Sequence, residues 1–164
     1  MIDSRRSLIS QPHSRHSFRV REELEEYFGE IADLMHDDFN HEVVERLKQH
    51  VSNEDYCMLV SGAFTPLLHA VTKNLPIEKI IGTEVPYESN ILAHRTPVIH
   101  IQGSLKTKKI MEALGGESID WANSYAYGDS HSDLPVLELV GNPVAVRPEP
   151  RLRTIASERN WEII

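Results

Sequence analysis

Two aspartates four residues apart form the part of this sequence best suited to metal and phosphate chemistry. Asp129 follows an apolar run that ends in Gly128, and Asp133 lies one helical turn further along the chain. A carboxylate at the end of a parallel strand, with a helix beginning behind it, lies in the ligand-binding crevice of an α/β sheet. Mg²⁺ is held by one or two such carboxylates and keeps several waters. The spacing therefore predicts Asp129 as a Mg²⁺ ligand, with Asp133 facing the same crevice.

A purely structural role competes with this interpretation. Ser130 and Asp133 have the spacing of a capping box, in which a serine and an acidic residue three positions later satisfy the free N–H groups at the start of a helix. This stretch alone does not decide between a metal site and a helix cap.

Two further polar positions fall where an α/β sheet binds ligands. Ser61 and Gly62 follow a buried apolar run and precede a helix, so a hydroxyl and a backbone N–H could bind a phosphoryl oxygen there. Lys106 opens another helix, where its ammonium could neutralise a phosphate and its metal. Each position is weak when taken alone, because Ser-Gly is common in turns and an isolated lysine is usually solvated at the surface.

The elements that must position these residues alternate along the chain. Residues 1–19 are rich in Ser, Arg and His and are expected to form a mobile tail. From residue 40 onward strands alternate with helices, which predicts an α/β fold with a Rossmann-like, mostly parallel sheet and helices on both faces. Strands are expected at 56–60, 80–81, 123–127 and 143–146, and helices at 21–35, 40–51, 65–74, 104–114, 131–140 and 149–158.

Two helices make more detailed expectations possible. Ser104 is expected to cap the helix that ends at Gly115-Gly116. Asn40 is expected to cap the helix that follows it. That second helix is expected to bury Val43, Val44, Leu47 and Val51.

Composition excludes several classes of function. The 164 residues, 40% apolar and 26% charged, are typical of one soluble globular domain, and the net charge of −8 argues against nucleic-acid binding. No apolar run approaches the roughly 18 residues of a membrane span, and no secretory signal is recognised, so a cytoplasmic location is expected. The single Cys57 lies in an apolar run and is expected to be an inert thiol.

The order and spacing of the three polar sites resemble the haloacid dehalogenase-like (HAD) phosphatases. Leu59-Val60-Ser61-Gly62 is similar to the second motif of that family, and Gly103-Ser-Leu-Lys106 to the third. The stretch from Tyr127 to Leu137 is similar to the fourth. The resemblance covers roughly residues 36–164, and the continuation through Trp161 resembles the phosphoserine-phosphatase-like branch in particular.

Members of that family hydrolyse phosphomonoesters through a covalent aspartyl phosphate, with Mg²⁺ as cofactor. By this resemblance Ser61 and Gly62 bind the phosphoryl group of a small phosphorylated substrate, and Lys106 holds its charge. Asp129 ligates Mg²⁺, and Asp133 supports Lys106 and the surroundings of the metal, so the resemblance implies a catalytic role for Lys106 and Asp133.

The first motif of the family, a buried strand ending in Asp-x-Asp-Gly-Thr, has no counterpart here. No Asp-x-Asp occurs in the sequence, and Asp3 has no strand before it, so no nucleophile is identified. The helical cap is expected to be reduced to residues 20–36, which leaves 37–164 as the core domain. Because unpaired strand groups are costly, residues 4–10 are expected to enter the sheet, or the sheet to close up, or a second copy or another chain to donate a strand.

Two functions follow as expectations. One is a Mg²⁺-dependent HAD-like phosphatase that is truncated or impaired because its nucleophile motif is absent. The alternative is a catalytically inactive HAD-like module that binds or regulates.

Overall fold

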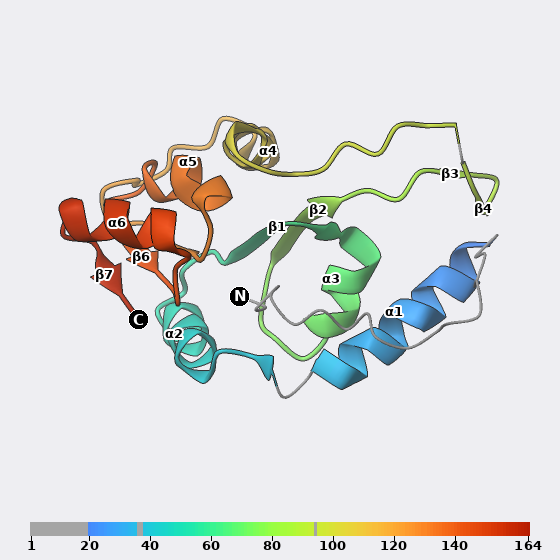
Figure 1. Cartoon of the computed structure of the whole chain (residues 1–164), viewed down its shortest axis with the longest axis horizontal. Helices are drawn as coiled ribbons and strands as arrows, with labels where there is room; N and C mark the ends of the chain where they lie inside the picture. The colour runs from blue at the N-terminus through green and yellow to red at the C-terminus, as the bar shows by residue number, and fades with distance from the viewer. Residues whose placement is uncertain (1–19, 36–37, 94) are drawn as a thin grey trace. The chain divides into compact units, whose positions relative to one another are not determined.

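The computed structural model describes residues 20–35, 38–93 and 95–164 (Figure 1). The expected tail at 1–19 lies outside the described residues, as do Asp3 and the segment 4–10. By its internal contacts the described chain divides into two compact units, one before Ile101 and one over Ile101–Ile164.

A parallel strand pair forms the centre of the first unit. β1 (Met58–Phe64) pairs in parallel with β2 (Lys79–Thr83), and α3 (Thr65–Val71) makes the crossover between them. In Figure 1, α3 lies against both strands, and α1 (Arg21–Met35) packs on the other side of α3. The buried apolar residues of these elements are Phe28, Ala32, Leu68, Val71 and Ile81.

The register between β1 and β2 is interrupted at Ser61–Ala63. Val60 pairs with Ile81, whereas Phe64 pairs with Thr83, so four steps along β1 oppose two steps along β2. The additional residues bulge out of the ladder, and bulges of this kind commonly occur beside functional sites because they re-aim side chains.

Two smaller elements complete this unit. α2 (His41–Ser52) begins after Asn40, whose side-chain oxygen accepts hydrogen bonds from Glu42 N (3.0 Å) and Val43 N (3.4 Å), so the predicted cap is confirmed. None of the residues of α2 is fully buried, so the expectation that its four apolar residues are buried is wrong. β3 (Tyr87–Glu88) and β4 (Ile91–Leu92) form a short antiparallel hairpin.

The second unit is built on a three-stranded parallel sheet. Its strands are β5 (Tyr125–Gly128), β6 (Asn142–Ala145) and β7 (Glu162–Ile163), in the order β5-β6-β7. β7 has only two residues, too few for a sequence pattern to predict it. The parallel register aligns the carboxyl ends of β5 and β6, since Gly128 pairs with Ala145.

Helices connect these strands. The unit contains α4 (Ser104–Leu114), α5 (Leu134–Leu137) and α6 (Pro150–Glu158), and a 3₁₀ turn at His131–Asp133 leads into α5. Figure 1 shows α5 and α6 beside the strands that they connect. One apolar cluster joins strands and helices, with Ala126, Leu137, Ala145, Leu152 and Ala156 buried at its centre.

The predicted α/β class with parallel strands is confirmed. The division into a cap at 20–36 and a core at 37–164 stays a prediction, as does the absence of the central first-motif strand. Within residues 20–35, 38–93 and 95–164, no helix combines the length and the apolar character that a membrane span requires.

Candidate functional site

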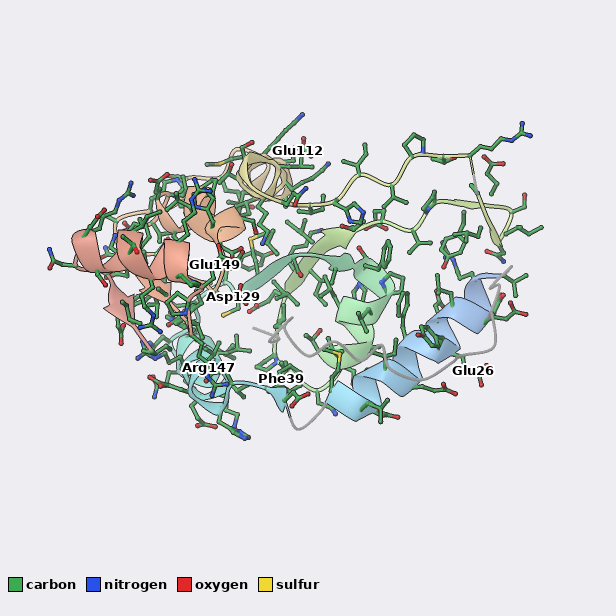
Figure 2. All side chains as sticks on the ribbon, in the orientation of Figure 1. Glu26, Phe39, Glu112, Asp129, Arg147 and Glu149 are labelled. Atoms are coloured by element: carbon green, nitrogen blue, oxygen red, sulfur yellow. The ribbon has the colours of Figure 1, made fainter. Side chains whose placement is uncertain are left out.

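Asp129 is the first residue after β5, at the carboxyl edge of the three-stranded sheet. The segment that follows β6 fixes the backbone here: Gly128 O accepts a hydrogen bond from Val146 N (2.8 Å), and Asp129 O accepts one from Glu149 N (2.9 Å). The side chain is partly buried and is labelled in Figure 2. A strand end thus presents this carboxylate, as the sequence predicts.

Asp133 uses both of its carboxylate oxygens within the protein. Oδ1 accepts a hydrogen bond from Lys106 Nζ at 2.5 Å. Oδ2 accepts from Asp129 N (3.2 Å), Ser130 N (3.1 Å) and Ser130 Oγ (3.1 Å). Asp133 therefore holds the loop that carries Asp129 and links that loop to α4.

The capping box that competed with the metal-site interpretation is present. Ser130 and Asp133 exchange the two reciprocal hydrogen bonds of that motif, and the 3₁₀ turn at His131–Asp133 follows. The structural interpretation is thus confirmed for Asp133. The additional ion pair with Lys106 goes beyond what a cap requires.

Lys106 lies in the first turn of α4 and is buried, with 7% of its surface exposed. Interpreted alone, this residue would be a solvated surface lysine, and that interpretation is wrong. A buried ammonium is stable only when it is paired, and Asp133, itself 8% exposed, supplies the opposite charge.

The two aspartates differ in their electrostatic surroundings. Burial raises the pKa of Asp129 to about 6, and the neighbouring Asp133 adds to this rise through its negative charge and a hydrogen bond that favours the protonated form. Burial would also raise the pKa of Asp133. For that residue, however, the charge and hydrogen bond of Lys106, together with hydrogen bonds from Ser130, outweigh burial and hold the pKa below its usual value.

These observations test whether the residues suit Mg²⁺. The oxygens of Asp133 are already occupied, so Asp129 is the carboxylate best placed to ligate a cation. Burial, and after it the negative charge of Asp133, raise the pKa of Asp129, and a bound cation would favour its ionised form. Among the described residues no group of three or more His, Cys, Asp or Glu side chains could hold a metal. A Mg²⁺ bound here would therefore have Asp129 as a single carboxylate ligand and would keep several waters.

Ser61 and Gly62 belong to the other unit, where they lie in the bulge of β1. Ser61 Oγ accepts a hydrogen bond from Ala63 N (3.2 Å), so its own O–H can donate to a ligand. Gly62 O accepts from Thr83 Oγ1 at 2.7 Å, which fixes the bulge to β2. The structure thus brings Lys106, Asp129 and Asp133 together within one unit, whereas Ser61 and Gly62 belong to the other. The functional roles of all five residues stay predictions.

The sequence interpretation missed Glu149, which contacts the Asp129 loop. Glu149 Oε1 accepts a hydrogen bond from His131 N at 2.7 Å, across eighteen positions of the sequence. One signal was available: Glu149 stands between Pro148 and Pro150, four residues after the end of β6, which pairs with β5.

Cys57 is not a candidate nucleophile. Burial, with smaller contributions from the negative charges of Glu78 and Asp55, raises the pKa of its thiol to about 11. The reactive thiolate is therefore scarce at neutral pH.

Comparison with known proteins identifies a family and several relatives. A model of the haloacid dehalogenase-like hydrolases matches residues 4–138. Phosphoserine phosphatase SerB1 of Mycobacterium tuberculosis is 29% identical over 119 residues, which cover 73% of this chain and 39% of that protein. Histidinol-phosphatase of Neisseria meningitidis is 29% identical over 125 residues, 72% of this chain and 55% of that protein. The chain thus spans about two fifths to just over half of the length of these relatives.

Two solved structures are similar to this chain in fold. A crystal structure of a protein of unknown function from Bordetella pertussis is 26% identical, has a TM-score of 0.78, and covers 88% of this chain and 67% of its own. Phosphoserine phosphatase in its apo form is 19% identical with a TM-score of 0.53, over 73% of this chain and 57% of its own, and supports the fold alone.

Proposed function

Because this chain belongs to the haloacid dehalogenase-like hydrolases, we propose that it provides the phosphate and Mg²⁺ site of a phosphomonoester hydrolase. The observation that carries the proposal is the buried Lys106–Asp133 pair beside Asp129, at the carboxyl edge of β5. Parallel α/β sheets bind their ligands at this edge.

Lys106, Asp133 and Asp129 would each contribute differently to stabilising the charge of a phosphoryl group. Lys106 holds a fixed positive charge that can stabilise the oxygens of a phosphoryl group. Asp133 orients that ammonium, and it also fixes the backbone of Asp129 and Ser130. Asp129 would ligate Mg²⁺, and the bound cation would supply further positive charge at the phosphoryl oxygens.

In the other unit, Ser61 and Gly62 are proposed to bind a phosphoryl oxygen. The bulge of β1 projects these residues from the ladder, and the Ser61 hydroxyl retains its donor. A small phosphorylated substrate is the ligand that this set of donors suits best, and its identity depends on surroundings beyond these residues.

The missing element is a nucleophile. No Asp-x-Asp occurs among these 164 residues, so they contain no counterpart of the family's nucleophile motif, and attack by water without a covalent nucleophile would be slow. This observation favours a second candidate function, a non-catalytic module that binds Mg²⁺ and phosphate.

Release of phosphate from an aryl phosphate, measured with and without Mg²⁺, tests the proposal. Activity that requires both Mg²⁺ and Asp129 supports a hydrolase, and it should be lost in Asp129→Ala but not in Glu138→Ala, a control at an exposed glutamate of the same unit. Activity that rises more steeply than protein concentration would indicate that an assembly of more than one copy is the active form.

The same variants separate hydrolase from binding module. If no phosphate is released, but Mg²⁺ with inorganic phosphate raises the unfolding temperature of the wild type and not of Asp129→Ala, the binding module is supported. If neither activity nor an Asp129-dependent shift is observed, both candidate functions are wrong.

A further inference from the structure

Glu149 occupies the N-cap position of α6 but does not cap that helix. N-cap side chains normally accept a hydrogen bond from the first turn of their own helix, and Ser, Thr, Asp and Asn are preferred there. Glu149 makes no such bond. Its carboxylate instead accepts from His131 N at 2.7 Å, in the loop between the two aspartates.

The backbone of Glu149 contacts the same loop. Its N–H donates to Asp129 O at 2.9 Å, so one residue binds a carbonyl at position 129 and an N–H at position 131. Asp129 and Glu149 are both labelled in Figure 2, where they are neighbours. The loop is therefore held on one side by the Asp133 carboxylate and on the other by Glu149.

Pro150 restricts the backbone of Glu149. It is the first residue of α6, and a proline restricts the residue before it to extended conformations. Glu149 has φ −59° and ψ 159°, within that extended region. Little backbone entropy is therefore lost when Glu149 is held against the loop, although its side chain still loses rotamer freedom.

We propose that Glu149 is a positioning residue, which holds the Asp129 loop in one conformation and thereby fixes the Asp129 carboxylate at the end of β5. The expected effect of Glu149 on Mg²⁺ affinity rests on the function proposed above. The expected effect of Glu149 on the conformation of the loop does not depend on that function. Partners that orient a metal ligand typically change metal affinity 10- to 100-fold when they are removed, by the order of magnitude known from other sites.

Amide hydrogen exchange in the metal-free protein, followed by NMR, tests the effect on the loop directly. In Glu149→Ala we expect exchange at the His131 amide to accelerate by about tenfold or more, because its acceptor is lost. Glu149→Gln keeps an acceptor oxygen and should retain most of the protection. Glu138→Ala, which removes an exposed carboxylate bound to Arg159, should leave the loop unchanged.

The amides of α6 separate positioning from simple helix capping. If Glu149→Ala accelerates exchange in the first turn of α6 and leaves His131 unchanged, Glu149 acts on its own helix and the proposal is wrong. If Glu149→Ala does not fold, Glu149→Asp decides, because its side chain is one methylene shorter and cannot keep the same bond with His131 N. Faster exchange at His131 with the amides of α6 unchanged supports the proposal, and unchanged exchange at His131 overturns it.

Mg²⁺ binding, measured by calorimetry, gives the second readout. We expect an affinity about 10- to 100-fold lower in Glu149→Ala and within about threefold of wild type in Glu149→Gln and Glu138→Ala. If the wild type binds no Mg²⁺, the Mg²⁺ site of the proposed function is refuted. The hydrogen-exchange data still decide whether Glu149 positions the loop. Equal Mg²⁺ affinity in wild type and Glu149→Ala would overturn the positioning of Asp129.

Discussion

Asp129 and Asp133 lie four residues apart on one loop, yet their pKa values change in opposite directions. Burial acts on both carboxylates, but Lys106 forms an ion pair with Asp133, whereas at Asp129 its charge offsets burial only in part. Asp133 is therefore a fixed anion that organises the loop, whereas the charge of Asp129 is poorly compensated. The loop thus contains one carboxylate that stabilises the fold and one that costs stability until a cation binds.

Replacing Asp129 with Asn should stabilise the metal-free protein at neutral pH. The folded protein binds this proton more tightly than the unfolded chain, because the pKa rises from 3.8 to about 6. The penalty is therefore absent well below pH 3.8, grows between about pH 3.8 and 6, and is complete above that. We expect the free energy of unfolding of Asp129→Asn to exceed that of wild type by about 1–2 kcal/mol at pH 7.5, because solvent screens part of the effect at this partly exposed carboxylate, and to come close to it near pH 4. Urea unfolding at both pH values measures this difference.

Mg²⁺ binding should weaken in acid, because the cation competes with a proton for Asp129. With a pKa of about 6, the carboxylate is mostly ionised at pH 7.5 and mostly protonated at pH 5. We expect the apparent affinity to be about tenfold lower at pH 5 than at pH 7.5, since one decade of affinity accompanies each pH unit below the pKa. Calorimetry at three pH values tests this, and a pH-independent affinity would exclude Asp129 as the ligand.

Lys106→Met should be among the most destabilising single changes in this unit. It leaves the Asp133 carboxylate, 8% exposed, buried without its cation. Removing one partner of a buried pair typically costs about 3–5 kcal/mol. Urea unfolding of Lys106→Met, Asp133→Asn and the double variant forms a double-mutant cycle. The double variant should lose clearly less than the two single variants together, and strict additivity would show that the pair does not interact.

Gly128→Ala should disturb the site through the carbon that it adds. A Cβ at this position would lie 2.7 Å from Asp133 Cβ and 3.0 Å from Leu137 Cδ1, closer than atoms pack. We expect a loss of about 1–3 kcal/mol in the free energy of unfolding. Gly29→Ala is the matched control, because nothing lies within 4 Å of its added Cβ and it lies within α1. That control should be neutral or more stable by about 0.5–1 kcal/mol.

Local signals in the sequence predict most of the second unit. Gly115 ends α4 in the left-handed conformation with φ 61°, as a glycine after a helix should. At the other end of α4 the prediction was wrong by one residue. Gly103, with φ 55°, takes the cap position, and Ser104 is the first helical residue. A serine and a glycine in sequence are both acceptable caps, and backbone geometry decides between them.

What the sequence could not reveal depends on contacts between distant segments. The contact of Glu149 with His131 joins residues eighteen positions apart, and the pairing of Lys106 with Asp133 joins residues twenty-seven apart. Periodicity describes which face of an element is apolar, but it does not say which polar groups meet. The resemblance to a known family placed Lys106 and Asp133 in one site, whereas nothing comparable indicated Glu149.

The hydrogen bonds of Asp133 determine which of the site residues selection for a stable fold alone would retain. Lys106 and Asp133 hold the loop together, so selection for a stable fold would preserve both after catalysis is lost. Asp129 weakens the metal-free fold, so in a lineage that no longer binds a cation it would be the first to be replaced. Among related chains, Asp129 is therefore the position whose retention indicates selection for function.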